Sequence, residues 1–210
     1  MKHLRMPWLP RIVAILCLSF LAIAGNAQMT PKYVTTTANS GGYYEYLPTS
    51  YWNGANQSYP LLIFLQGIGE MGDGSPSQLS RMAWVGLPGV INGGRFPSSF
   101  TVNGQTFSYI VLAPQFKNWP SPSDVNDIIN YAIQNYRVDQ SRIYVTGLSM
   151  GGGVTWQYAG TYANRVAAIL PICGAANFHP FLTFFLLNME IRPWRGMESH
   201  HVYCNFLSLF

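Results

Sequence analysis

Ile143-Tyr144-Val145-Thr146-Gly147-Leu148-Ser149-Met150-Gly151 joins a buried-looking apolar run to a segment that we expect to be helical from about Gly151 to Tyr162. Its last five residues form a G-x-S-x-G pentapeptide, which in this context predicts a tight strand-to-helix turn with a strained serine. The two glycines keep the crowded turn free of side-chain clashes. Because the turn raises the Ser149 hydroxyl beside the partly positive helix N-terminus, we predict a nucleophile rather than a plain Gly/Ser-rich loop.

Three further apolar runs extend this picture in both directions along the chain. Continuous apolar runs bounded by glycine or proline are typical of strands buried on both faces. The four predicted strands are Pro60–Leu65, Tyr109–Ala113 (stopped by Pro114), Ile143–Thr146 (stopped by Gly147) and Val166–Leu170 (closed by Pro171). The Tyr- and Thr-rich stretch from Tyr33 to Tyr46, broken at Asn39–Gly42, predicts a hairpin of two short strands.

A helix is predicted between the second and third of these strands. Ser123 is its expected cap, Asp124 suits its positive end, and Val125, Ile128, Ile129, Ala132, Ile133 and Tyr136 form one apolar face. Buried strands that alternate with helices predict an α/β fold with a mainly parallel sheet and flanking helices.

The N-terminus resembles an export signal. Lys2, Arg5 and Arg11 precede the apolar run Ile12–Ala24, and small residues follow at Gly25 and Ala27. Thirteen helical residues reach only about 20 Å, short of a hydrocarbon core of about 30 Å. We therefore expect cleavage after Ala27, a secreted or periplasmic protein, and no stable membrane anchor.

Composition limits the remaining body to one exported globular domain. The 210 residues are 49% hydrophobic and 10% charged, which suits one core and argues against disorder. Without residues 1–27, nine basic and eight acidic residues leave a net charge of +1 instead of +4, so nucleic acid is not an expected partner. Of the two cysteines left, Cys173 and Cys204 either pair or serve as small packing residues.

A second loop can complete the site. The predicted strand Pro60–Leu65 ends in Gln66-Gly67-Ile68-Gly69-Glu70, a turn whose amides can face Ser149. Acyl transfer needs two donors for the developing oxyanion. The amides of Ile68 and Met150 are our candidates, with Gly67 adjacent; the alternative is a plain glycine turn.

Four motifs resemble those of secreted α/β-hydrolases: Phe64–Glu70, Leu112–Gln115, Asp139–Tyr144 and Gly147–Gly152. The closest group is the phospholipase/carboxylesterase and polyhydroxybutyrate-depolymerase-like esterases, which includes feruloyl and acetylxylan esterases. The resemblance covers about residues 33–177 and implies that Ser149 is the nucleophile and that Ile68 and Met150 form the oxyanion hole. It implies a small or polymeric ester as substrate, and no metal or organic cofactor. Where this group usually carries a structural histidine, the chain has Gln66.

The rest of a catalytic triad is the main departure. In this fold the acid and the histidine follow the serine, but all four aspartates precede Ser149. The candidates are Glu198 as acid and His200 or His201 as base, with His179 less suited; the alternative is that these histidines lie exposed near a chain end.

The last 33 residues, 178–210, match no motif, whereas two further βα units would need about 60–90 residues. We interpret them as an atypical tail that arises from a frameshift, a truncation or a misassigned gene end. The fold is then expected to lack its last strands and to leave Val166–Leu170 as an apolar edge.

The sequence thus predicts a signal peptide at 1–27, an α/β-hydrolase core at 28–177 and the tail at 178–210. The expected activity is hydrolysis of carboxylic esters through an acyl-serine. The alternatives are an inactive hydrolase fold that binds a ligand, a non-functional fragment, and a peptidase of the same fold. Trp84, Trp119 and Trp156 are expected either to line a pocket or to pack in the core.

Overall fold

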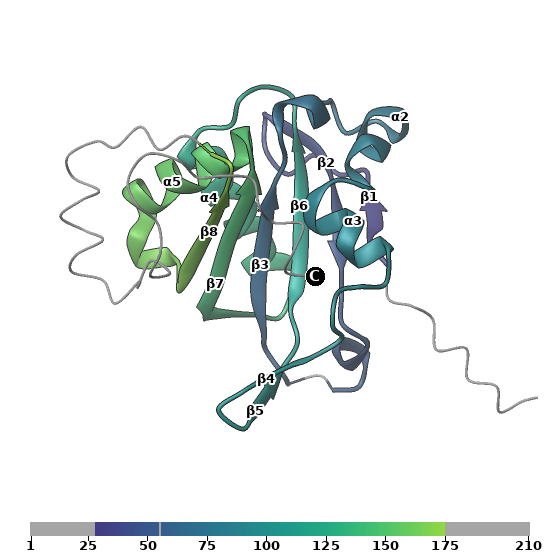
Figure 1. Cartoon of the computed structure of the whole chain (residues 1–210), viewed down its shortest axis with the longest axis vertical. Helices are drawn as coiled ribbons and strands as arrows, with labels where there is room; N and C mark the ends of the chain where they lie inside the picture. The colour runs from purple at the N-terminus through teal and green to yellow at the C-terminus, as the bar shows by residue number, and fades with distance from the viewer. Residues whose placement is uncertain (1–27, 55, 175–210) are drawn as a thin grey trace, which may run out of the picture.

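A six-stranded, mainly parallel sheet forms the centre of the computed structural model, which describes residues 28–54 and 56–174 (Figure 1). The strand order is β1-β2-β6-β3-β7-β8; β6, β3, β7 and β8 run parallel, while β1 and β2 pair antiparallel at one edge. The strands are β1 (Thr30–Lys32), β2 (Ser40–Tyr46), β3 (Tyr59–Leu65), β6 (Ile110–Phe116), β7 (Val138–Leu148) and β8 (Ala168–Ile172). The predicted α/β class is confirmed.

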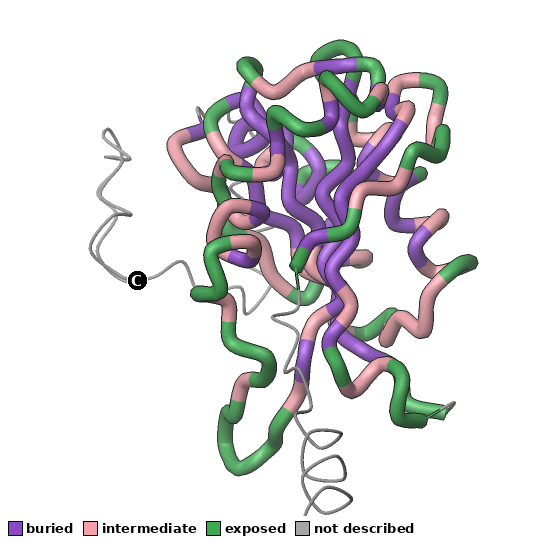
Figure 2. The backbone as a smooth tube through the Cα atoms, turned by 90° about the vertical axis from the view of Figure 1, so that its right-hand side faces the viewer, coloured by how far each residue is buried: buried purple, intermediate pink, exposed green. Residues whose placement is uncertain are grey.

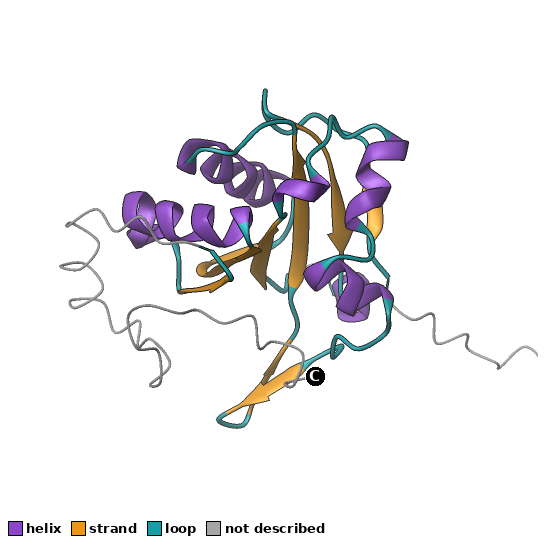
Figure 3. Ribbon diagram, turned by 45° about the horizontal axis from the view of Figure 1, so that its top comes forward, coloured by secondary structure: helices purple, strands orange, loops and turns teal. Residues whose placement is uncertain are grey.

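Helices α4 (Pro122–Asn135) and α5 (Met150–Tyr162) cover one face of the sheet. Alternate residues of β3 separate the two faces, since Leu61, Ile63 and Leu65 pack with α4 and α5, whereas Phe64 packs on the opposite side. That opposite side carries the short helices α2 (Pro76–Leu79) and α3 (Gly86–Asn92), visible beside β6 and β1 in Figures 1 and 3. The buried backbone is concentrated in the strands between these layers (Figure 2).

Short elements connect these layers. Four single 3-10 turns occur at η1 (Thr49–Trp52), η2 (Ile68–Glu70), η3 (Ser80–Met82) and η4 (Ala163–Arg165). A two-stranded hairpin of β4 (Phe100–Val102) and β5 (Gln105–Phe107) projects from the end of the sheet opposite α2 (Figure 1). Neither this hairpin nor the helices α2 and α3 are predicted from the sequence.

Two strands were predicted to end at a proline, but both continue through it, β6 through Pro114 and β8 through Pro171. Pro114 lies within β6, where the pairing with β3 has already ended at Leu112, so no N–H is needed on that side. Pro171 lies within β8, which has a single neighbour among the described residues. β7 likewise continues through Gly147 to Leu148.

The predicted cap of α4 and the predicted first hairpin also need correction. Ser121 caps α4, because Pro122 occupies the first helical position, and the Asp124 amide donates to the Ser121 hydroxyl at 3.2 Å. The strand before β2 in the chain that pairs with it is β1 at residues 30–32, which precedes the predicted start at Tyr33; β6 pairs antiparallel on the other side of β2. An isolated bridge between Thr37 and Ser40 closes the loop that connects them.

Both ends of the chain lie outside the described residues, so the predicted signal peptide at 1–27 and the tail at 178–210 stay predictions. Over the part that the structure describes, none of the helices has the length and apolarity needed to cross a membrane.

Candidate active site

Ser149 lies at the sharp turn between β7 and α5, as the pentapeptide predicts. Its backbone has φ 55° and ψ −111°, a conformation that L-residues rarely adopt, and its side chain is exposed. The Ser149 amide donates to the carbonyl of Ile172 at 2.8 Å, and the Ser149 carbonyl accepts from Gly153 at 3.0 Å. The strained serine is therefore held by its own backbone bonds to β8 and α5, with its hydroxyl free of the fold's internal packing.

The two outer glycines of the pentapeptide are required by close backbone contacts. A Cβ atom on Gly147 would lie 2.5 Å from the Gly151 carbonyl group, and one on Gly151 would lie 2.1 Å from the Leu65 carbonyl oxygen. These separations are far below van der Waals contact. The absence of both side chains lets the first turn of α5 sit directly on the ends of β7 and β3.

Met150 places a free amide next to Ser149. It is the first residue of α5, and the first amides of a helix have no acceptor within the helix. The Ser149 amide is already bonded to Ile172, so Met150 supplies the nearest donor of the helix N-terminus, where the helix dipole is partly positive. Its own side chain is buried and anchors this turn.

The loop after β3 reaches the same edge of the sheet. Gly67 is buried, and a Cβ placed on it would lie 3.7 Å from the Leu148 carbonyl oxygen, which directly precedes Ser149. Ile68 begins the single turn η2, so its amide has no acceptor within that turn, and its side chain is 62% exposed. The structure thus brings Gly67, Ile68, Ser149 and Met150 together; their catalytic roles stay predictions.

Two buried glutamines fix this loop, and the sequence analysis missed one of them. Gln66 bonds the backbone of Phe116 twice: its Nε2 donates to the carbonyl at 3.1 Å, and its Oε1 accepts from the amide at 3.2 Å. Gln115 Nε2 donates to the carbonyls of Glu70 and Gln78, both at 2.8 Å, and its Oε1 accepts from the Gly74 amide at 3.1 Å. Gln66 therefore has the structural role expected for that position.

The predicted acid and base lie outside the described residues. Glu198, His200, His201 and His179 all belong to residues 175–210, and the described ranges contain no histidine. Residues 66–70 of the loop after β3 carry one carboxylate, that of Glu70, whose Oε2 would lie 2.7 Å from a Cβ on Gly67. Across residues 28–54 and 56–174, no group of three His, Cys, Asp or Glu side chains is placed to hold a metal ion.

The clearest pKa shifts occur away from this edge. Burial raises the pKa of the Tyr136 hydroxyl, which also donates to the Glu45 carboxylate, so this tyrosine stays neutral. Hydrogen bonds from Ser141, together with Arg142 at 2.7 Å, lower the pKa of Asp139 at the start of β7. The strand ends around Ser149 therefore carry backbone donors rather than strongly shifted acids.

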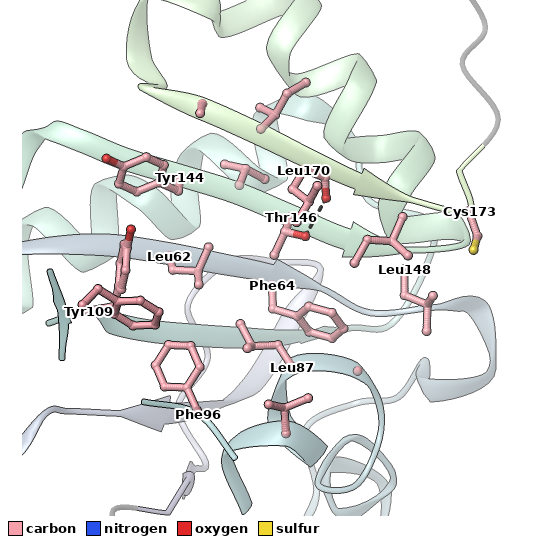
Figure 4. A pocket seen from close by; sticks show the side chains of 17 residues that line it. Leu62, Phe64, Leu87, Phe96, Tyr109, Tyr144, Thr146, Leu148, Leu170 and Cys173 are labelled. Carbon is pink, nitrogen blue, oxygen red and sulfur yellow. Dashed lines mark hydrogen bonds between the residues drawn. The ribbon is translucent and has the colours of Figure 1, made fainter. Parts of the chain in front are cut away.

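An apolar trough of about 540 Å³ lies on the sheet face opposite α5 (Figure 4). Residues of β3, β7 and β8 line it. Along β7 it extends from Tyr144 to Leu148, and one end lies at Cys173, which is disulfide-bonded. Ser149 is not among its lining residues, nor are Trp84, Trp119 and Trp156, so the expectation that these tryptophans line a pocket does not hold for this trough. Trp84 and Trp119 are exposed.

Comparison with solved structures identifies the architecture. The feruloyl esterase module of Clostridium thermocellum, solved as a mutant with sinapinate, superposes with a TM-score of 0.52 at 16% identity. The superposition covers 73% of this chain and 56% of that one. This chain has the α/β-hydrolase fold. A second structure, solved under the name FAE, matches with a TM-score of 0.53 at 17% identity over 76% of this chain and 61% of that one.

Two sequence relatives of this chain are a depolymerase and an esterase. Poly(3-hydroxyalkanoate) depolymerase C of Paucimonas lemoignei is 30% identical over 96 residues, which are 37% of this chain and 23% of that enzyme. A bifunctional acetylxylan esterase/xylanase of Neocallimastix patriciarum is 38% identical over 50 residues, 24% of this chain and 8% of that protein. No established family model matches the sequence. The chain spans less than two thirds of each of these relatives.

Proposed function

We propose that this α/β-hydrolase is a serine esterase that cleaves carboxylic esters through an acyl-serine on Ser149. The observation that carries the proposal is the exposed serine at φ 55°, between a parallel strand and a helix N-terminus. Strain of this kind at a serine persists only where the surrounding structure enforces it. The resemblance of the sequence to ester hydrolases supports the same activity.

The chemistry follows from the groups at this edge. The Ser149 oxygen attacks the ester carbonyl while its proton passes to a base, and the carbonyl oxygen becomes an oxyanion. The amides of Met150 and Ile68 are the donors for this oxyanion. Return of the proton to the leaving alcohol breaks the C–O bond, and water then hydrolyses the acyl-serine by the same steps in reverse order. We assign the base to His200 or His201 and its acidic partner to Glu198.

A fluorophosphonate probe tests the nucleophile directly. The folded chain should be labelled at Ser149 and should hydrolyse p-nitrophenyl acetate and butyrate, whereas Ser149→Ala should do neither. Ser77, an exposed serine on α2, provides the matched control, since Ser77→Ala should keep full labelling. A folded chain that binds esters without labelling would instead be a ligand-binding hydrolase fold, and an insoluble chain would be a fragment.

The base needs its own variants. Replacing both His200 and His201 with Ala should lower the labelling rate by about 10³-fold or more, since a serine without a base is a poor nucleophile. His179→Ala should leave the rate unchanged. Unchanged labelling in the double variant would reject these two histidines while leaving Ser149 as the nucleophile.

We also propose that the protein is exported and that the mature chain begins at Gln28. The extracted protein should then start at this residue in N-terminal mass spectrometry. Retention of residues 1–27 in the mature protein would reject the proposal.

A further inference from the structure

The trough exists because half of one sheet face lacks a covering layer. α4 and α5 cover the other face along its length, whereas α2 and α3 pack over β2, β6 and the near side of β3. The second half of this face, formed by β7 and β8, borders α3, whose Gly86, Leu87 and Val90 line the trough on the other side, and Leu170 of β8 is 52% exposed. Sheets of this parallel kind are normally covered on both faces.

The chemistry of the trough limits what can fill it. Its lining includes no charged side chain, and its hydroxyl-bearing members are Thr146, Tyr144 and Tyr109. The Thr146 hydroxyl already donates to the Leu170 carbonyl at 2.6 Å, as Figure 4 shows. The two tyrosine rings pack edge to face with their centroids 5.6 Å apart. An occupant therefore gains apolar contact and little else, which favours aliphatic and aromatic side chains over a polar ligand.

The chain itself supplies such side chains at the right place. The last described residue, Gly174, immediately follows Cys173 at one end of the trough, and 36 residues continue from there. Residues 175–189 contain no Asp, Glu, Lys or Arg, and six of the seven residues in Phe181–Leu187 are apolar. The four charged residues of residues 175–210 all lie after this segment, at Glu190, Arg192, Arg195 and Glu198.

The length of the connection is sufficient. Phe181 lies seven residue steps after Gly174, and seven steps can span up to about 23–25 Å when extended. The trough runs along four residue steps of β7, from Tyr144 to Leu148, or about 13 Å. The apolar run can therefore turn back from the end of β8 and lie along the whole trough.

We propose that Phe181–Leu187 docks in this trough and forms the missing layer over β7 and β8. The inference is independent of the esterase activity. It makes the tail a packing element of the fold, whatever the origin of its sequence. It also accounts for how an apolar sheet face of this size is kept from water in an exported protein.

Photo-cross-linking in the full chain tests this placement. p-Benzoylphenylalanine replaces Tyr144, an aromatic residue inside the trough. After irradiation, trypsin releases this position in peptide 143–165 and the apolar run in peptide 166–195. Irradiation should join these peptides, with fragment ions that place the link at residues 181–187. The same reagent at Gln134, exposed on α4 of the opposite face, should give no such link. Links at residues 168–172 alone, or equal linking from position 134, would overturn the proposal.

Matched tail variants separate this run from apolar residues in general. The triple variant Phe181→Ser, Phe184→Ser and Phe185→Ser should lose the cross-link at least tenfold and bind a hydrophobic dye several-fold more strongly. Val202→Ser, Phe206→Ser and Leu207→Ser together should change neither. The same segment from a second copy of the chain is the other possible occupant. A mixture of ¹⁴N- and ¹⁵N-labelled chains tests it, because cross-links that join a ¹⁴N peptide to a ¹⁵N peptide would show that a second copy fills the trough and would overturn the proposal.

Discussion

The two loops that meet at Ser149 are fixed by different physical means. The nucleophile turn is held by backbone packing, with Gly147 and Gly151 each allowing contacts that a single methyl group would block. The loop at residues 66–70, which we call the oxyanion loop after its proposed role, is held by side-chain hydrogen bonds from Gln66 and Gln115, which reach across 37 to 50 residues of sequence. The nucleophile turn depends on local backbone contacts and tolerates almost no substitution at its glycines. The oxyanion loop depends on several separate hydrogen bonds, each of which contributes part of its stability.

Gly151→Ala should break the nucleophile turn with the largest effect of any single change here. Its Cβ would lie 2.1 Å from the Leu65 carbonyl oxygen and 2.7 Å from that of Gln66, a clash with backbone that no side-chain rotation relieves. We expect unfolding free energy to fall by more than about 3 kcal/mol in urea denaturation. Gly69→Ala is the control in the oxyanion loop, where a Cβ has open space, and it should change stability by less than about 1 kcal/mol. Equal effects of the two variants would contradict the steric account.

Gln115→Leu should be the most damaging change in the oxyanion loop. It leaves the carbonyls of Glu70 and Gln78 and the amide of Gly74 without their partner in a buried site. We expect a loss of about 2–3 kcal/mol in unfolding free energy, together with slower fluorophosphonate labelling of Ser149. Gln134→Leu, on the exposed face of α4, serves as the control. A loss of stability without any change in labelling would show that this network supports the fold but not the loop.

Gln66→Leu should have a smaller effect, because two hydrogen bonds to one residue are lost instead of three to three residues. The expected cost in unfolding free energy is about 1–2 kcal/mol by the same denaturation. Gln66→His tests whether an imidazole can substitute, since it retains one donor or acceptor and should recover part of the loss. A cost above that of Gln115→Leu would reverse the ranking proposed for the two glutamines.

Ser149→Gly should stabilise the protein while abolishing labelling. Glycine adopts φ 55° without strain, so the substitution removes the strain energy of the folded state. Glycine also raises the conformational entropy of the unfolded chain, which opposes folding. The relief of strain is the larger effect, and we expect a net increase of about 0.5–1 kcal/mol in unfolding free energy. Ser149→Ala keeps the Cβ and therefore the strain, so it should remain near the parent. If both variants had the same thermal midpoint, the backbone at this turn would not be strained.

Asp139→Asn provides a reference outside both loops, at the far end of β7 from Ser149. The folded-state pKa of Asp139 is lowered, so its contribution to stability is present above its ordinary value of 3.8 and is lost as the pH falls through the lowered one. The variant should be less stable by under about 1 kcal/mol at pH 7, and this difference should shrink below pH 3.8. Fluorophosphonate labelling should stay unchanged, and a slower rate would mean that the two ends of β7 are coupled.

The contrast between the loops also explains what the sequence could predict. The G-x-S-x-G turn is a local pattern, so Ser149, Met150 and the strand and helix around them were found directly. The role of Gln115 depends on residues 37 and 45 positions away, and no local pattern marks it. Pro114 and Pro171 were misread as strand ends because their tolerance depends on which neighbouring strand is present. The helices α2 and α3 are short and rich in residues that local patterns assign to loops.

The hydrogen bond from the Ser149 amide to the Ile172 carbonyl gives the outermost parallel strand of the described sheet a second role. β8 has one strand neighbour, and strands at an edge open more often than those inside a sheet. Each opening of β8 removes the acceptor that holds the nucleophile's backbone in place. How often β8 opens therefore determines how long Ser149 keeps the backbone geometry proposed for reaction. The exchange rate of the Ser149 amide hydrogen measures how often β8 opens.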